Sequence, residues 1–166
     1  MSIRMKHLFR PLLPLLAVMS LSAQAETMLP DIELQTLEGE SMLLSETSGK
    51  FRVINFWATW CPPCVKEMPS LAKLDAELAA IDADVITINV GEQQDQVEAF
   101  ILENLEPNQM DMLLDPPGKA FPAFRLSGLP ITLVVSADNR ILDTALGERE
   151  WDSPEMVAAI KGLANN

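Results

Sequence analysis

The chain has 166 residues, enough for one domain with a substantial core and too few for two ordinary domains. Hydrophobic residues make up 48% of the chain, which excludes an intrinsically disordered protein. The formal net charge of −12 argues against nucleic acid and anionic lipid as partners, because an acidic protein repels both.

The residue types available for polar catalysis are few. The only histidine is His7, there is no tyrosine, and the two cysteines are Cys61 and Cys64. Without a histidine in the body of the chain, Ser-His-Asp catalysis, Cys-His catalysis and histidine-ligated metals are excluded. Two thiols alone also disfavour a closed zinc site, so we expect neither a metal nor a cofactor. Cysteine is then the one strong nucleophile near neutral pH.

Residues 1–25 have the three parts of a secretory signal peptide. A mainly apolar run at 12–21 precedes the small-x-small cleavage site Ala23-Gln24-Ala25. The basic residues before the run are Arg4, Lys6, His7 and Arg10. We therefore predict export to an oxidising compartment, a bacterial periplasm, with the mature domain at residues 26–166. The alternative is an uncleaved membrane anchor, although the run is about half of the roughly 20 residues that a spanning helix needs.

Beyond residue 26, the hydrophobic pattern alternates between the strand and helix periods. The order of these segments predicts an α/β fold, with a mixed central sheet flanked by helices on both faces. Pro69 lies inside the first helix and is expected to kink it. The predicted elements are a hairpin within 28–50, a strand at 51–57, a helix at 62–81, a strand at 84–90, a helix at 93–105, a strand at 112–114, strands at 131–136 and 141–146, and a last helix that starts at Pro154.

The two cysteines lie in Cys61-Pro62-Pro63-Cys64, where the buried strand at 51–57 gives way to the first long helix. A Cys-x-x-Cys pair at a helix start is typical of a redox site. Free N–H groups and the helix dipole there lower a thiol pKa from about 8.5 into the range of roughly 3.5–7.5. The alternative is a structural disulfide, but a bridge that closes so short a loop removes little entropy from the unfolded chain.

Glu67 follows Cys64 by three residues and lies on the same apolar face of the predicted helix. A half-buried glutamate has a raised pKa, so it can carry a proton near neutral pH. Glu67 could then relay a proton to or from Cys64, and the two groups would titrate together. The alternative is an ordinary solvated residue of the helix.

Two further features have a structural and a functional interpretation. Trp57 is predicted to be in the core, whereas Trp60 is predicted to be partly exposed, where it could touch a partner. Met110 and Met112 could supply thioether ligands to copper, but their spacing of two favours a strand that packs into the core.

Four motifs in this order resemble a thioredoxin fold, and in detail the TlpA/ResA/DsbE family of exported thiol–disulfide oxidoreductases. The resemblance covers residues 28–165 and adds an N-terminal β-hairpin to the fold. A lone Cys-x-x-Cys would be a weak signal, but four motifs in the right order are a strong one. The motifs are Asn55-Phe56-Trp57-Ala58-Thr59-Trp60-Cys61 with Pro62-Pro63-Cys64, Glu67-Met68-Pro69, Asn89-Val90-Gly91-Glu92, and Gly128-Leu129-Pro130-Ile131-Thr132.

The resemblance implies a role for each site residue. Cys61 would be the exposed attacking thiol, and Cys64 the buried resolving thiol. Pro130 would be a cis-proline facing the active site, and the backbone of Leu129 would pair with an extended substrate segment beside Trp60. Glu67 would handle the proton of Cys64. Where thioredoxin keeps a buried aspartate, this chain has Asn55, which points to the exported, reducing branch.

The function expected from the resemblance is reduction of disulfides in exported proteins, for example in cytochrome c assembly. A membrane thiol reductase would supply the electrons, and we expect a monomer. The alternative is a copper chaperone that binds Cu(I) through Cys61 and Cys64, since soft thiolates suit this ion. Peroxide reduction ranks low, because Ala58 occupies the position where such sites want a Thr or Ser.

Overall fold

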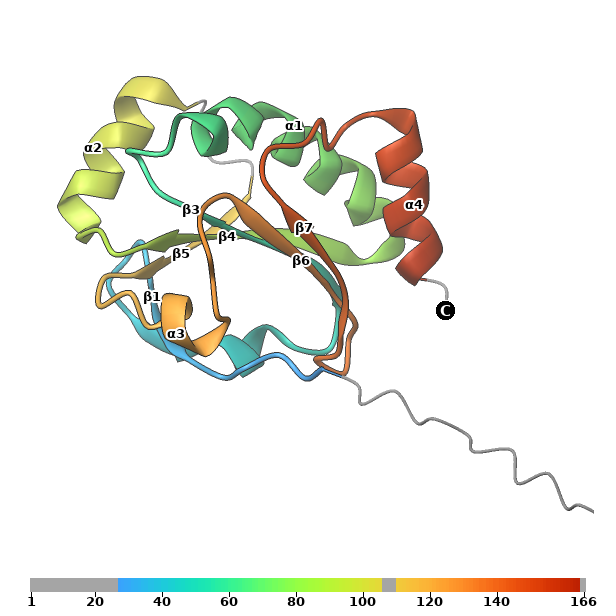
Figure 1. The fold of residues 1–166 in the computed structure, drawn as a ribbon, viewed down its shortest axis with the longest axis horizontal. Helices are drawn as coiled ribbons and strands as arrows, with labels where there is room; N and C mark the ends of the chain where they lie inside the picture. Colours follow the sequence, from blue (N-terminus) through green and yellow to red (C-terminus); the bar gives the residue numbers. More distant parts are fainter. Residues whose placement is uncertain (1–26, 106–109, 165–166) are drawn as a thin grey trace, which may run out of the picture.

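A computed structural model describes residues 27–105 and 110–164, so the predicted signal peptide lies outside the described residues. A seven-stranded mixed sheet runs through the middle of the molecule, in the order β2-β1-β5-β4-β3-β6-β7 (Figure 1). The strands are β1 (Glu33–Thr36), β2 (Ser41–Leu43), β3 (Phe51–Trp57), β4 (Ala83–Val90), β5 (Asp111–Asp115), β6 (Ile131–Val135) and β7 (Ile141–Leu146). The helices are α1 (Pro62–Leu78), α2 (Gln94–Asn104), α3 (Ala120–Ala123) and α4 (Pro154–Ala164), with 3-10 turns at η1 (Leu44–Thr47) and η2 (Ala79–Ile81).

The middle of the sheet is parallel and its two sides are antiparallel. Strands β3, β4 and β5 run parallel to one another, as their connections through α1 and α2 require. The β1–β2 hairpin joins the sheet through β1, which is antiparallel to β5. On the other side β6 is antiparallel to β3, and β7 to β6. In this register Asn55 of β3 lies opposite Thr132 of β6.

Two hydrophobic layers cover the two faces of the sheet. Helices α1, α2 and α4 lie on one face, and the short α3 lies on the other (Figure 1). Side chains of β3 alternate between these layers, so Val53 and Trp57 pack toward α1 while Ile54 and Phe56 pack toward α3. All four are fully buried, which explains why β3 reads as a nearly continuous apolar run.

The expected fold class is confirmed, including the N-terminal hairpin. Helix α1 ends at Leu78 and continues to Ile81 only as the 3-10 turn η2. Trp57 is in the core as expected, and Met110 and Met112 pack against the α1 layer. The one-turn helix α3 was not predicted. Within the described residues, no helix is long and apolar enough to cross a membrane.

Candidate active site

The Cys-x-x-Cys pair lies at the start of α1, directly beyond the buried end of β3. Cys61 is the N-cap residue, and Pro62 follows as the first helical residue, where its missing N–H costs nothing. The Cys61 N–H donates to the Ala58 carbonyl at 3.1 Å, which closes a tight turn between strand and helix. A disulfide joins Cys61 to Cys64, with Cα atoms 5.3 Å apart, so the structure is that of the oxidised protein.

The expected exposure of Cys61 is not found. Cys61 is only 4% exposed and Cys64 is fully buried. The disulfide-bonded Cys61 packs into the hydrophobic layer that α1 covers. Trp60, the preceding residue, is 64% exposed and forms the prominent apolar surface beside the disulfide.

Pro130 lies at the same end of the sheet as the disulfide. The Leu129–Pro130 peptide bond is cis, as the resemblance implied. Pro130 directly precedes β6, and the first residue of β6, Ile131, is paired with Phe56 near the end of β3. The Pro130 carbonyl accepts a hydrogen bond from the Gly147 N–H at 2.9 Å, which ties this loop to the end of β7.

Glu67 is the buried charge of the site. It is 2% exposed, and its carboxylate accepts hydrogen bonds from three N–H donors. Asn55 Nδ2 donates to Oε1 at 2.8 Å, while the Arg149 backbone N–H and Trp151 Nε1 both donate to Oε2 at 3.0 Å. The prediction that Glu67 faces inward with Cys64 is therefore confirmed, and the burial is deeper than expected.

Burial raises the pKa of the Glu67 carboxyl above its ordinary value, because a low-dielectric interior disfavours the charged form. The hydrogen bonds from Trp151, the Arg149 N–H and Asn55 pull the pKa down again, since each favours the carboxylate. The balance leaves the pKa raised, which is the direction that the sequence predicted.

Asn55 links Glu67 to the strand that follows Pro130. Its Nδ2 group donates both to Glu67 Oε1 and to Thr132 Oγ1, each at 2.8 Å. Its Oδ1 atom is buried without a hydrogen-bond partner among the described residues. The Asn55 amide nitrogen therefore bridges the Glu67 carboxylate and the Thr132 hydroxyl, while its amide oxygen accepts no hydrogen bond from the described residues.

A second buried carboxylate holds the turn that leads to Cys61. Glu92 is 8% exposed, and its Oε2 accepts the Thr59 backbone N–H at 2.7 Å and Asn89 Nδ2 at 2.8 Å. Its Oε1 accepts the Thr59 hydroxyl at 2.5 Å. Glu92 lies in the connection between β4 and α2, and from there it fixes the backbone of Thr59, two residues before Cys61.

Sequence reasoning named Glu92 and Thr132 only as members of motifs and gave them no role, and it did not name Trp151. A buried indole N–H usually finds a partner, so Trp151 could have been suspected of such a bond but not assigned to Glu67. Trp60 is exposed, Leu129 is half-buried and Pro130 is buried, and their contacts with a substrate remain predictions. In residues 27–105 and 110–164, no group of three or more His, Cys, Asp or Glu side chains could hold a metal ion.

Comparisons with known proteins agree with this geometry. A model of the AhpC/TSA family matches residues 25–144. Thiol-disulfide oxidoreductase ResA from Halalkalibacterium halodurans is 32% identical over 114 residues, which are 69% of this chain and 64% of that protein. ResA from Bacillus subtilis is 29% identical over 118 residues, 71% of this chain and 65% of that protein. The match thus spans just under two thirds of the length of these two relatives.

A solved structure supports the fold. The crystal structure of a thiol:disulfide interchange protein of the thioredoxin family from Chlorobium tepidum matches with a TM-score of 0.65 at 23% identity. The match covers 82% of this chain and 97% of that one. This likeness shows a thioredoxin-type fold. The family model spans well over half of the chain, so the chain belongs to the AhpC/TSA family.

Proposed function

We propose that this protein is a thiol–disulfide oxidoreductase that reduces disulfides in exported proteins. The observation that carries the proposal is the Cys61–Cys64 disulfide at the start of α1, one turn before the buried Glu67. A structural bridge needs no ionisable group beneath it, whereas a redox pair must gain and lose protons. The names of the ResA relatives support the same activity.

In the reduced protein, the Cys61 thiolate attacks one sulfur of a substrate disulfide. That disulfide breaks, its other sulfur leaves and takes up a proton, and Cys61 is joined to the substrate. Cys64 then loses its proton and attacks the Cys61 sulfur, which forms the Cys61–Cys64 bridge and releases the second substrate thiol. The protein has given two electrons to its substrate. One substrate proton balances the proton that Cys64 loses, and the other comes from the solvent, which received the Cys61 proton when the thiolate formed.

Glu67 accepts the proton of Cys64 in the second step. The two residues are three positions apart on the buried face of α1, so they are neighbours on successive turns. A carboxyl with a raised pKa is suited to exchange a proton near neutral pH. Asn55 Oδ1 has no hydrogen-bond partner among the described residues, and its amide group contacts this carboxylate. This oxygen could accept a hydrogen bond from a donor of the reduced site.

We assign the reducing direction from Glu67 as well. Ionised, its buried charge disfavours a nearby thiolate, so the reduced form is less stabilised and the pair gives up electrons more readily. A membrane thiol reductase would restore the dithiol in an oxidising compartment. The predicted signal peptide and the resemblance support a periplasmic location, and a role in cytochrome c assembly fits the resemblance.

The test measures two properties of the purified protein. The reduced form should reduce a protein disulfide, Cys61→Ser should abolish the reaction, and Glu67→Gln should slow it and change its pH dependence. The reduction potential should lie near those of reductants such as thioredoxin, at about −270 mV. A potential near −120 mV, the value of a strong oxidant, would contradict the reducing direction.

A copper chaperone remains the second hypothesis from the sequence. Titrating the reduced protein with Cu(I) against a competing chelator separates the two functions. Absence of a tight one-to-one complex would exclude the chaperone and leave the exchange reaction unaffected.

A further inference from the structure

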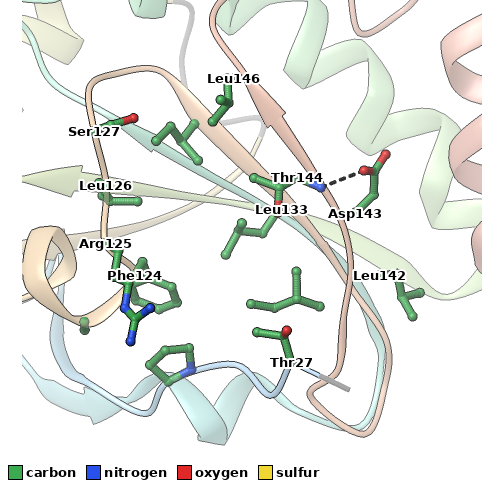
Figure 2. A pocket seen from close by; sticks show the side chains of 14 residues that line it. Thr27, Phe124, Arg125, Leu126, Ser127, Leu133, Leu142, Asp143, Thr144 and Leu146 are labelled. Carbon is green, nitrogen blue, oxygen red and sulfur yellow. Dashed lines mark hydrogen bonds between the residues drawn. The ribbon is translucent and has the colours of Figure 1, made fainter. Parts of the chain in front are cut away.

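A hollow of about 770 Å³ lies on the sheet face opposite α1 and α4, between the segment after α3 and strand β7 (Figure 2). Ile131 and Leu133 of β6 belong to the buried layer on this face, and they contribute to the hollow. Among residues 27–105 and 110–164, the helix on this face is the one-turn α3, so no long described helix covers the β6–β7 hairpin here. We call this hollow the β7 groove; its other lining residues include Phe124, Arg125, Leu126, Ser127, Asp143 and Leu146.

The β7 groove is continuous with the loop that carries Pro130. Ser127 lines the groove and lies two residues before Leu129, the position assigned to substrate backbone pairing. Ile131 and Leu146 also line the groove, and they are paired across β6 and β7 directly after Pro130. Leu146 is 57% exposed, so an apolar side chain stands at the end of the groove closest to the disulfide.

Arg125 occupies a position in the groove wall that favours glycine. Helix α3 ends in a Schellman motif, with the Leu126 N–H donating to the Phe121 carbonyl at 3.0 Å and the Arg125 N–H to the Pro122 carbonyl at 3.4 Å. In this motif the residue that follows the last helical turn adopts the left-handed backbone conformation. Arg125 is that residue, with φ +52°. Within residues 27–105 and 110–164, the exposed Arg125 side chain makes no ion pair or hydrogen bond.

We propose that the β7 groove receives an extended segment of the substrate protein next to its disulfide, with apolar side chains and one carboxylate that pairs with Arg125. This inference rests on the proposed function and names its substrate class. The apolar floor supplies the hydrophobic contact, and the unpaired guanidinium supplies the charge complementarity.

The experiment compares peptides that carry one cysteine as a mixed disulfide with a chromogenic thiol. One series has leucines around the cysteine and a glutamate moved along either flank, and the matched series has glutamine in its place. The purified reduced protein attacks the mixed disulfide, and the released thiol gives kcat/KM. A small aromatic disulfide without a peptide is the control for the exchange chemistry.

We expect one position of glutamate to raise kcat/KM about threefold over glutamine, as suits a single exposed charge pair. Arg125→Gly should remove this difference while the fold stays at least as stable, because glycine suits the left-handed position. Lys119→Ala removes a positive charge just before α3 and outside the groove, and should keep the difference. Leu146→Asp should lower kcat/KM for both leucine series and leave the small disulfide unaffected.

Equal rates for the glutamate and glutamine series at every position, unchanged by Leu146→Asp, would overturn the groove proposal while the exchange function stands. Failure of the small disulfide to react would instead contradict the proposed function itself. A dimer in solution that Leu146→Asp dissociates would mean that a second copy of the chain covers the groove, and this result too would overturn the proposal.

Discussion

The indole N–H of Trp151 donates a hydrogen bond of 3.0 Å to the carboxylate of Glu67, a residue 84 positions earlier in the chain. Trp151 is 1% exposed and comes from the loop between β7 and α4. The same loop supplies the Arg149 backbone N–H to the same oxygen. A loop far from the cysteines in sequence therefore favours the carboxylate form of Glu67, against the burial that raises its pKa.

Glu67→Gln should change how stability depends on pH. The folded pKa of Glu67 is raised, so its favourable contribution is fully present below the unfolded pKa of about 4.3 and is lost as pH rises through the folded value. Denaturant unfolding of the oxidised proteins, in which the cysteines do not titrate, should show the wild type losing stability relative to Glu67→Gln over that range. A difference between the two proteins that does not vary with pH would contradict the raised pKa.

Trp151→Phe should push the Glu67 pKa higher still, because the lost hydrogen bond favoured the carboxylate. The variant should also lose about 1–3 kcal/mol of stability near neutral pH, the cost of an unsatisfied buried polar group. Trp57→Phe is the matched control, since the Trp57 indole N–H has no hydrogen-bond partner among the described residues. A carboxyl titration by NMR should move in Trp151→Phe and stay in place in Trp57→Phe.

Asn55→Asp should bring a second carboxylate beside Glu67 Oε1, which Asn55 Nδ2 now contacts at 2.8 Å. Two buried carboxylates this close cannot both ionise. The free energy of unfolding of the variant should therefore fall by about 3–5 kcal/mol near neutral pH, and part of this loss should be recovered in acid. The double variant Asn55→Asp/Glu67→Gln removes the repulsion and should be more stable than Asn55→Asp alone. Additive losses in this cycle would show that the two groups are not coupled.

Glu92→Ala should loosen the turn before Cys61, because it removes the acceptor of both the Thr59 N–H and the Thr59 hydroxyl. The expected loss of stability is about 1–3 kcal/mol, and the rate at which Cys61 attacks a small disulfide should fall. Glu98→Ala, on the exposed side of α2, serves as a control for the lost charge. An unchanged rate in Glu92→Ala would mean that the turn is held by the helix and strand alone.

The sequence predicted most of the sheet, because each strand carries its own hydrophobic pattern. It also predicted Cys61, Cys64 and the inward-facing Glu67, since all three share one helix and its period. Helix α3 escaped prediction because it has one turn, contains Pro122, and is capped by Asp115 through the N–H groups of Lys119 and Ala120.

The contacts around Glu67 could not be predicted for a different reason. Trp151 and Thr132 meet the α1 side of the sheet only when β6, β7 and the following loop fold back onto β3. The hydrophobic periodicity within one segment cannot predict a contact between side chains of distant segments. The burial of Cys61 likewise could not be predicted, because a position at a helix start is compatible with an exposed or a buried side chain.

The most direct test of the exchange mechanism is to map the covalent adduct formed with a disulfide-containing protein. Reduced Cys64→Ser should form a stable mixed disulfide, and mass spectrometry of its peptides should place the bond on Cys61. Reduced Cys61→Ser should form none, because the buried Cys64 can only resolve. An adduct on Cys64 in the Cys61→Ser protein, or no adduct with either variant, would contradict the account.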